Sequence, residues 1–350
     1  MKEENNFPEV ALIIAAYNEE DIILDKVQNC FGLDYPKGKL KIKFVTDGSI
    51  DETSYILRAI KGIELHHLDE RKGKLAAVNR IVEACQSPII ILTDANCFLN
   101  KDAIKNIVRH YRDPRVGGVA GEKRIRKDFS STTAGSGEGI YWRYESWLKQ
   151  LDSDLNSVVG AAGELFSFRK SVYEAVPPDT IIEDFVLSMR IAMRGFRVVY
   201  EPNAYALEAP SVSVREEWKR KVRICAGAFQ AFRYLPGIWN PFKYGVLSFQ
   251  YLSHRFLRWS VVPFLLPLII IFSGILSTQS TFYTGLFLIE LIVLAITLIG
   301  LMVMDRISMP KIVTILTYIL MMNAAAYAGL YRYWRGSQSA VWKKAKRHLL

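Results

Sequence analysis

Hydrophobic positions follow two different periods along the first two thirds of the chain. Short apolar runs at 10–15, 40–46, 63–68 and 89–92 are bounded by polar residues and predict β-strands. Between them, apolar residues at helical spacing predict three helices. Ile22, Ile23 and Val27 mark the first helix, and Leu75, Val78 and Val82 mark the third. The second is expected to be capped by Ser49 or Asp51, with Tyr55, Ile56 and Ala59 on its inner face. Alternating strands and helices predict right-handed βαβ units and a parallel or mixed sheet, so residues 1–235 are expected to form an α/β domain.

Two further segments of this domain carry weaker patterns. KDFSSTTAGSGEG, at 127–139, is rich in Ser, Thr and Gly and predicts a loop. IYWRYESWLKQ, at 140–150, is aromatic and predicts a helix near a groove or a membrane. The first predicted strand does not lead into GxGxxG, so the fingerprint of a dinucleotide-binding fold is absent.

The last third of the chain is almost continuously apolar. Residues 259–289 contain no charge, 282–304 contain only Glu290, and 312–331 are uncharged. A membrane span needs about 20 apolar residues, so we expect about three transmembrane helices within 259–331. The amphipathic, aromatic stretch 236–258 predicts an interfacial segment, and 332–350 form a basic tail. Three full crossings would place that tail across the membrane from the first domain. Either one stretch does not cross, or the preference of basic residues for the cytosol does not hold.

Composition and charge agree with a membrane protein. The chain has 350 residues, is half hydrophobic and carries a formal charge of +10. Six basic residues and no acid lie in 332–350, and six more lie against two acids in 215–233. Both clusters flank the apolar third, which favours cytosolic flanks of membrane helices over a nucleic-acid surface. The four cysteines form no CxxC pair, and no apolar run precedes the first strand, so we expect no disulfide framework, no zinc site and no signal peptide. The expected location is the plasma (inner) membrane, multi-pass, with the first domain in the cytosol.

Polar residues follow the predicted strands where each one ends. Asp47 follows the second strand, Lys74 follows the third, and Asp94 and Asn96 follow the fourth. The carboxyl ends of parallel strands meet at one edge of a sheet, where open α/β folds bind ligands. A carboxylate at position 47 can accept from the N–H of a base, and Asp94 with Lys74 suits a metal-bound diphosphate. Asp and Asn alone are also ordinary turn formers. The prediction of a binding site therefore rests on several such residues being expected at the same edge of the sheet.

Taken together, these motifs resemble the family 2 glycosyltransferases, inverting GT-A enzymes that use nucleotide sugars. The nearest likeness is the membrane-bound branch that contains cellulose, chitin, hyaluronan and poly-N-acetylglucosamine synthases. AAYNEE, TDGSIDET and RKGKLAAVN are similar to its nucleotide motifs, and TDAN stands where the family has Asp-x-Asp. The resemblance implies a Mg²⁺ or Mn²⁺ ion on Asp94 and Asn96. It also implies that a nucleotide sugar, expected to be a UDP-sugar, binds at Ala16, Tyr17, Glu19, Asp47, Lys74 and Asn79.

The resemblance continues to about residue 230. GAAGELF, at 160–166, is similar to the segment that lines the acceptor side, which implies that role for Gly163 and Glu164. IIED, at 181–184, matches the Glu-Asp motif, which implies that Asp184 is the general base with Glu183 beside it. The structural alternative is that both acids stabilise a helix N-terminus. RKVRI, at 220–224, aligns with Gln-x-x-Arg-Trp, which implies that Arg220 and Arg223 cover the diphosphate. Ile224 stands at the Trp position.

The expected function is that of a membrane-anchored inverting glycosyltransferase. It would use a nucleotide sugar to build a β-linked extracellular polysaccharide or glycoconjugate. One alternative is the transfer of a single sugar to a lipid-linked acceptor. Another is a transferase-like subunit of low activity in a polysaccharide synthesis or export complex. The expected partners are a sugar or lipid-linked acceptor, the membrane, and a second copy of the chain or an export protein, with no nucleic acid.

Overall fold

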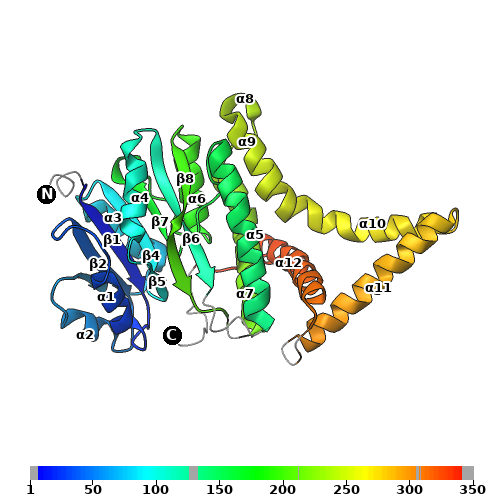
Figure 1. The fold of residues 1–350 in the computed structure, drawn as a ribbon, viewed down its shortest axis with the longest axis horizontal. Helices are drawn as coiled ribbons and strands as arrows, with labels where there is room; N and C mark the ends of the chain where they lie inside the picture. Colours follow the sequence, from blue (N-terminus) through cyan, green and yellow to red (C-terminus); the bar gives the residue numbers. More distant parts are fainter. Residues whose placement is uncertain (1–6, 126–132, 212, 305–306, 308, 341–350) are drawn as a thin grey trace.

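A mixed β-sheet forms the centre of the first domain in the computed structural model, which describes residues 7–125, 133–211, 213–304, 307 and 309–340 (Figure 1). The sheet order is β3-β2-β1-β4-β7-β6-β8-β5. The strands from β3 to β4 are parallel, β7 runs antiparallel to both β4 and β6, and β5 runs antiparallel to β8. The strands are β1 (Val10–Ala16), β2 (Leu40–Asp47), β3 (Glu64–Leu68), β4 (Ile89–Asp94), β5 (Cys97–Leu99), β6 (Val116–Ile125), β7 (Phe166–Arg169) and β8 (Arg197–Glu208).

Helices cover both faces of this sheet and continue beyond it. The helices are α1 (Ile23–Phe31), α2 (Thr53–Arg58), α3 (Lys74–Ala84), α4 (Ala103–Val108), α5 (Thr133–Leu155), α6 (Glu183–Met193), α7 (Val214–Tyr234), α8 (Pro241–Tyr244), α9 (Val246–Tyr251), α10 (Val262–Leu276), α11 (Thr281–Val303) and α12 (Lys311–Trp334). Two 3₁₀ turns occupy Arg109–Arg112 and Lys170–Val172, and a π-helical segment, Leu252–Val261, joins α9 to α10.

The period-two pattern of the strands sorts the core into two layers. On β1, Ala11 and Ile13 pack with α3 and α6, whereas Leu12 and Ile14 pack with α1, α2 and α4. Successive side chains of a strand point to opposite faces, so a continuous apolar run is what a strand covered on both faces requires. In the sheet, β2 and β3 follow on one side of β1, and β4 lies on its other side. The direction in which strands are added therefore reverses between β1 and β4, and the carboxyl ends of these two strands form a switch point next to Asp94.

The C-terminal helices leave the sheet domain and then return to it. Val246–Leu276, Thr281–Val303 and Lys311–Trp334 are each long and apolar enough to cross a membrane. In Figure 1, α10 and α11 extend away from the sheet as a hairpin, and α12 comes back beside α7. Tyr318 of α12 donates to Glu217 of α7, and Tyr333 stacks on Phe229, with ring centroids 6.4 Å apart. The two helices therefore run side by side in the same direction over several turns.

Several expectations from the sequence need correction. Tyr55 is 72% exposed rather than inward-facing, because α2 is short and buries Thr53 and Leu57 instead. Its first residue, Thr53, donates its backbone N–H to Asp51, one of the two expected caps. The loop expected at 127–139 lies outside the described residues up to 132, and from Thr133 onward it is helical as part of α5. The first apolar stretch breaks between Leu276 and Thr281. Its helix begins at Val246, and the interfacial location expected for 236–258 stays a prediction.

Candidate functional site

The carboxyl ends of β1 and β2 form one side of a small cavity. Tyr17, Asp47 and Arg71 line it together with Ala16, Lys74 and Asp94. Asp47 is 5% exposed, and its Oδ2 accepts the backbone N–H groups of Lys72 and Gly73. Its Oδ1 is buried and has no hydrogen-bond partner among the described residues. A buried carboxylate oxygen of this kind is suited to accept an N–H of a ligand.

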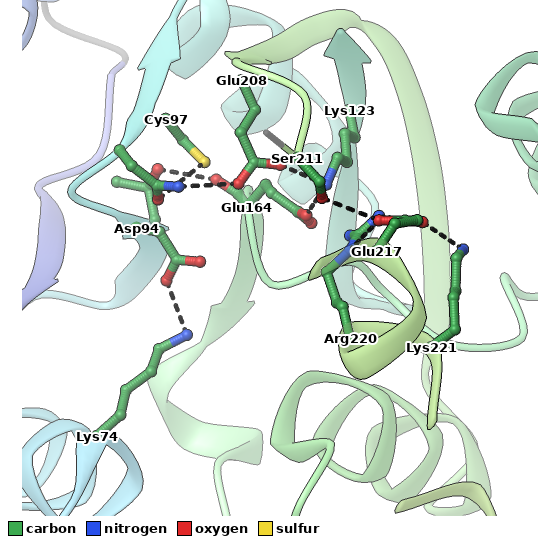
Figure 2. A network of polar contacts seen from close by, with 12 residues as sticks. Lys74, Asp94, Cys97, Lys123, Glu164, Glu208, Ser211, Glu217, Arg220 and Lys221 are labelled. Carbon is green, nitrogen blue, oxygen red and sulfur yellow. Dashed lines mark hydrogen bonds and ion pairs between the residues drawn. The ribbon is translucent and has the colours of Figure 1, made fainter. Parts of the chain in front are cut away.

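A lysine pairs with two carboxylates at the centre of the site, beside a third. Lys74 begins α3, and its Nζ lies 2.7 Å from Asp94 Oδ1 and 3.1 Å from Glu183 Oε1. Burial alone lowers the pKa of Lys74, but Asp94 and Glu183 outweigh it and hold that pKa above its ordinary value. The neighbouring Asp184 belongs to the same cavity wall. The ends of β4, α3 and α6, far apart in sequence, thus meet at one point, and Figure 2 includes the Lys74–Asp94 pair.

Asp184, in the same cluster, has a pKa near neutral pH. Burial and then the charge of Glu183 raise the pKa of Asp184 to about 7, although Lys74 opposes the shift. Burial also acts on Glu183, but Lys74 and Arg223 lower the pKa of that carboxyl below its ordinary value. The pKa values of these two adjacent acids at the start of α6 therefore differ, so that at neutral pH Glu183 is ionised and Asp184 is close to half-protonated.

A second cavity, of about 140 Å³, begins at Asp184 and lies under α5 and α7. Gly163 makes room at the junction, because a Cβ there would lie 3.3 Å from Asp184 Oδ2. Glu164 reaches this cavity while pairing with the buried Lys123, 2.5 Å away. Burial raises the pKa of Glu164, but Lys123 outweighs it, so that this pKa lies well below its usual range. Asp184 therefore faces a cavity on each side, one shared with Lys74 and Asp94 and one shared with Glu164.

Asn96 lies in the turn after Asp94, and its amide is directed elsewhere. The Nδ2 of Asn96 donates to Glu208 Oε1 at 3.0 Å, and Glu208 also pairs with Lys123. Figure 2 shows this chain of contacts from the Asp94 turn through Glu208 and Lys123 to Glu164. No group of three His, Cys, Asp or Glu side chains suited to a metal ion occurs in the described part of the chain. Asp94 is therefore a single carboxylate at this turn, and its partner in this structure is Lys74.

The two arginines of α7 have different partners. Ser213 caps the helix by accepting from the N–H of Glu216. One turn later, Arg220 donates its Nε and Nη2 to the buried Glu217, each at 2.9 Å. Arg223 donates Nη2 to the carbonyl of Ile181, and its buried Nε has no partner in the described residues. Arg223 therefore lies beside the Glu183–Asp184 pair, whereas Arg220 lines the cavity that contains Glu164.

Two expected binding residues lie away from these cavities. Glu19 is buried before α1, where its backbone N–H donates to Thr53 Oγ1 at 2.8 Å. Asn79, on α3, accepts a hydrogen bond from the hydroxyl of Tyr173. Both contacts join one element to another, Glu19 to the start of α2 and Asn79 to the segment before α6.

Several residues that line or support the site were not predicted from the sequence. Arg71 lies within the RKGK segment but was not singled out, and its guanidinium covers the Tyr17 ring at 3.7 Å. The buried Lys123 and the cavity-lining Arg255 and Trp259 come from segments with no motif. Arg255 and Trp259 carried a signal that could have been used, since a cation and an aromatic at this spacing share one helix face.

Comparisons with known proteins show what the sheet domain is similar to. The model of the family described as Glycosyl transferase family 2 matches residues 11–176. A poly-beta-1,6-N-acetyl-D-glucosamine synthase of Staphylococcus aureus (strain MSSA476) is 28% identical over 229 residues, which cover 63% of this chain and 55% of that protein. The corresponding protein of Staphylococcus epidermidis is 25% identical over 247 residues, covering 68% and 58%. The chain thus spans little more than half the length of these curated relatives.

A solved structure supports the same fold. The mannosyltransferase PcManGT from Pyrobaculum calidifontis, in complex with GDP-Man and Mn²⁺, matches with a TM-score of 0.70 and 23% sequence identity. The match covers 95% of this chain and 88% of the mannosyltransferase, so it includes the helices after the sheet. Together, the family match over residues 11–176 and the shared fold show that the sheet domain is similar to glycosyltransferases of family 2 and has a GT-A-like fold.

Proposed function

We propose that this chain is a membrane-anchored inverting glycosyltransferase that uses a nucleotide sugar to build a β-linked extracellular polysaccharide or glycoconjugate. The observation that carries the proposal is the meeting of Lys74, Asp94 and Glu183 at the switch point of the sheet, with Asp184 beside them. The synthases of Staphylococcus support the polysaccharide product.

The donor nucleotide would lie along the ends of β1 and β2. The free Oδ1 of Asp47 would accept an N–H of the base, and Tyr17 with Arg71 would form the adjacent wall. A uracil offers such an N–H, so we propose a UDP-sugar as the donor. Lys74 would approach the diphosphate, and Arg223 would add a second cation from α7.

Asp184 would accept the proton of the acceptor. The acceptor oxygen forms a bond to the anomeric carbon while the bond from that carbon to the diphosphate oxygen breaks. The proton passes to Asp184, and the nucleoside diphosphate leaves with the bonding electrons. A carboxyl with a pKa near 7 is a stronger base than an ordinary aspartate, which suits this role. The same displacement inverts the anomeric configuration.

A divalent ion, Mg²⁺ or Mn²⁺, fits the site at Asp94. It would supply positive charge to the departing diphosphate. Asp94 is a single carboxylate at the end of β4, in reach of the same Lys74 that would meet the phosphates. Asn96 faces Glu208 in this structure, so its role as a second ligand stays a prediction.

The decisive experiment measures the release of nucleoside diphosphate from a panel of UDP- and GDP-sugars. Purified protein in lipid, with Mn²⁺ or Mg²⁺, is compared with Asp184→Asn and with Asp154→Asn, an exposed acid of α5. We expect turnover of one donor, loss of about 10² to 10⁴-fold in the first variant, and wild-type rates in the second. Failure to bind any of these nucleotides would overturn the proposal.

A further inference from the structure

An apolar cavity of about 450 Å³ lies next to the Asp184 cavity, on the side of the long apolar helices. It is enclosed by α5, α7, the start of α10 and α12. Its aliphatic wall comes from Val262, Ile315, Ile319 and Ala326, and Trp259 closes one side. Such a wall offers little to a glycan chain, whose hydroxyl groups require hydrogen-bond partners when they leave water.

The apolar cavity and the Asp184 cavity share part of their lining. Tyr141, Cys225, Trp259 and Met322 contribute to both. The two cavities are therefore adjacent, and a ligand that extends from Asp184 toward these side chains leaves a polar site and approaches an apolar one.

The far side of the apolar cavity opens between helices that are apolar on their outer surfaces. Val262 of α10 is 42% exposed, and Ile319 of α12 is 49% exposed. Both belong to helices long and apolar enough to cross a membrane. Farther along, the two helices are held together, because Tyr327 donates to the carbonyl of Pro263 at 2.7 Å. The opening thus faces the region that lipid would occupy.

Arg258 lines the apolar cavity next to Tyr141 and Trp259, which belong to both cavities. Arg258 pairs with Glu145 and donates Nη2 to the hydroxyl of Tyr141 at 2.9 Å. Its Nη1 is buried and has no hydrogen-bond partner among the described residues. An N–H of a guanidinium in such a position is a donor for an anionic oxygen, and a phosphate offers one.

We infer that the acceptor is a glycolipid: its sugar lies in the Asp184 cavity, its phosphate at Arg258, and its hydrocarbon chain in the apolar cavity. The inference rests on the proposed function and names the class of its acceptor. A lipid phosphate without a sugar fits less well, because a phosphate oxygen needs no general base and the carboxylates of Glu183 and Asp184 would repel it. A sugar hydroxyl has the proton that Asp184 would accept.

The test compares acceptors that differ only in their hydrocarbon chain. Wild-type protein in lipid nanodiscs is given its donor and either the methyl or the octyl β-glycoside of glucose, N-acetylglucosamine, galactose or mannose. Ile319→Trp narrows the mouth of the cavity. Ile312→Trp is the matched control, because Ile312 lies seven residues earlier on α12, is 63% exposed and does not line the cavity. Partitioning of the octyl chain into the nanodisc affects both variants equally.

We expect the octyl glycoside of one sugar to have a KM about 10-fold or more below that of its methyl glycoside, in the wild type and in Ile312→Trp. In Ile319→Trp this advantage should fall to about 2-fold or less, while donor binding stays unchanged. Turnover without a chain-length effect, or an effect equal in all three proteins, would overturn the glycolipid inference and leave the proposed function standing. Absence of turnover with every donor and glycoside, together with no nucleotide binding, would overturn both.

Discussion

At the scale of single residues, the protonation of Asp184 is the property on which the proposed chemistry depends. Burial, and then Glu183 and Glu164, disfavour its ionised form, whereas Lys74 favours it. A base must be ionised to accept a proton, so a carboxyl with a pKa of about 7 is active at and above neutral pH. The pKa of Asp184 therefore depends on each charged group around it.

The pH profile of transfer should report this balance. We expect kcat/KM to fall about tenfold per pH unit below pH 7 and to level off above it. Lys74→Met removes the cation that favours ionisation, so the midpoint should move to higher pH, whereas Lys74→Arg should leave it in place. The measurement is the midpoint rather than the amplitude, because Lys74 also affects donor binding. An unchanged midpoint in Lys74→Met would contradict the role assigned to Asp184.

Asp94 and Asn96 can be separated by their effect on metal affinity. Asp94→Ala should weaken the apparent affinity for Mn²⁺ by more than about 100-fold, because it removes the carboxylate ligand. Asn96→Ala should cost about 10-fold or less, because its amide supports Glu208. Mn²⁺ titration of donor turnover measures both. Equal losses in the two variants would make Asn96 a ligand.

At the scale of elements, α5 and the π-helical segment are joined by a buried cluster of charges. Glu145 of α5 lies 3.1 Å from Arg255 and also pairs with Arg258. Burial opposes ionisation, but Arg255 and Arg258 outweigh it and hold the pKa of Glu145 well below its ordinary value. A depressed pKa means that the stabilisation is present above the unfolded pKa and is lost only as the pH falls through the folded one. The cluster therefore connects α5, which covers the Asp184 cavity, to the π-helical segment that leads into α10.

Glu145→Gln should therefore destabilise the protein by about 3 kcal/mol, since it leaves two arginines buried without a countercharge. Glu174→Gln is the control, because Glu174 forms an exposed pair with Arg194. Its effect should be within about 1 kcal/mol. Chemical denaturation of the purified protein at pH 7 measures both. A change no larger than that of the control would indicate that water enters the cluster.

The elements differ in how far the sequence predicts them. The four parallel strands were predicted almost to the residue, because β1 and β4 are continuous apolar runs that end in polar turns. The helical start of α5 was missed, since Gly135 and Gly137 are poor helix formers and the packing that stabilises the helix involves distant residues. The same holds for Asn96: its contact with Glu208 spans more than a hundred residues, and no local pattern encodes it.

At the scale of the whole molecule, α12 determines how the chain meets the membrane. It lies along α7, a helix of the sheet domain, from Tyr318 at Glu217 to Tyr333 at Phe229. Gly329 allows the close approach, because a Cβ there would lie 2.5 Å from Cys225 Cβ. Ala340, beyond the helix, packs against the core of the sheet domain. We expect a helix bound to the domain at both its middle and its end to leave the chain on the side of the sheet domain, with its outer face, which includes Ile319, still against lipid.

We therefore predict that α10 and α11 cross the membrane as a hairpin and that the chain after α12 stays on the side of the sheet domain. This arrangement accords with the basic residues of 332–350, which prefer the cytosol. Single cysteines test it, and the four native cysteines are buried and give little background. In intact cells, a membrane-impermeant maleimide should label Thr278→Cys, between α10 and α11, and should label Ser339→Cys only after the membrane is opened. Labelling of Ser339→Cys in intact cells would mean three crossings, and α12 would then have to leave α7 in the membrane.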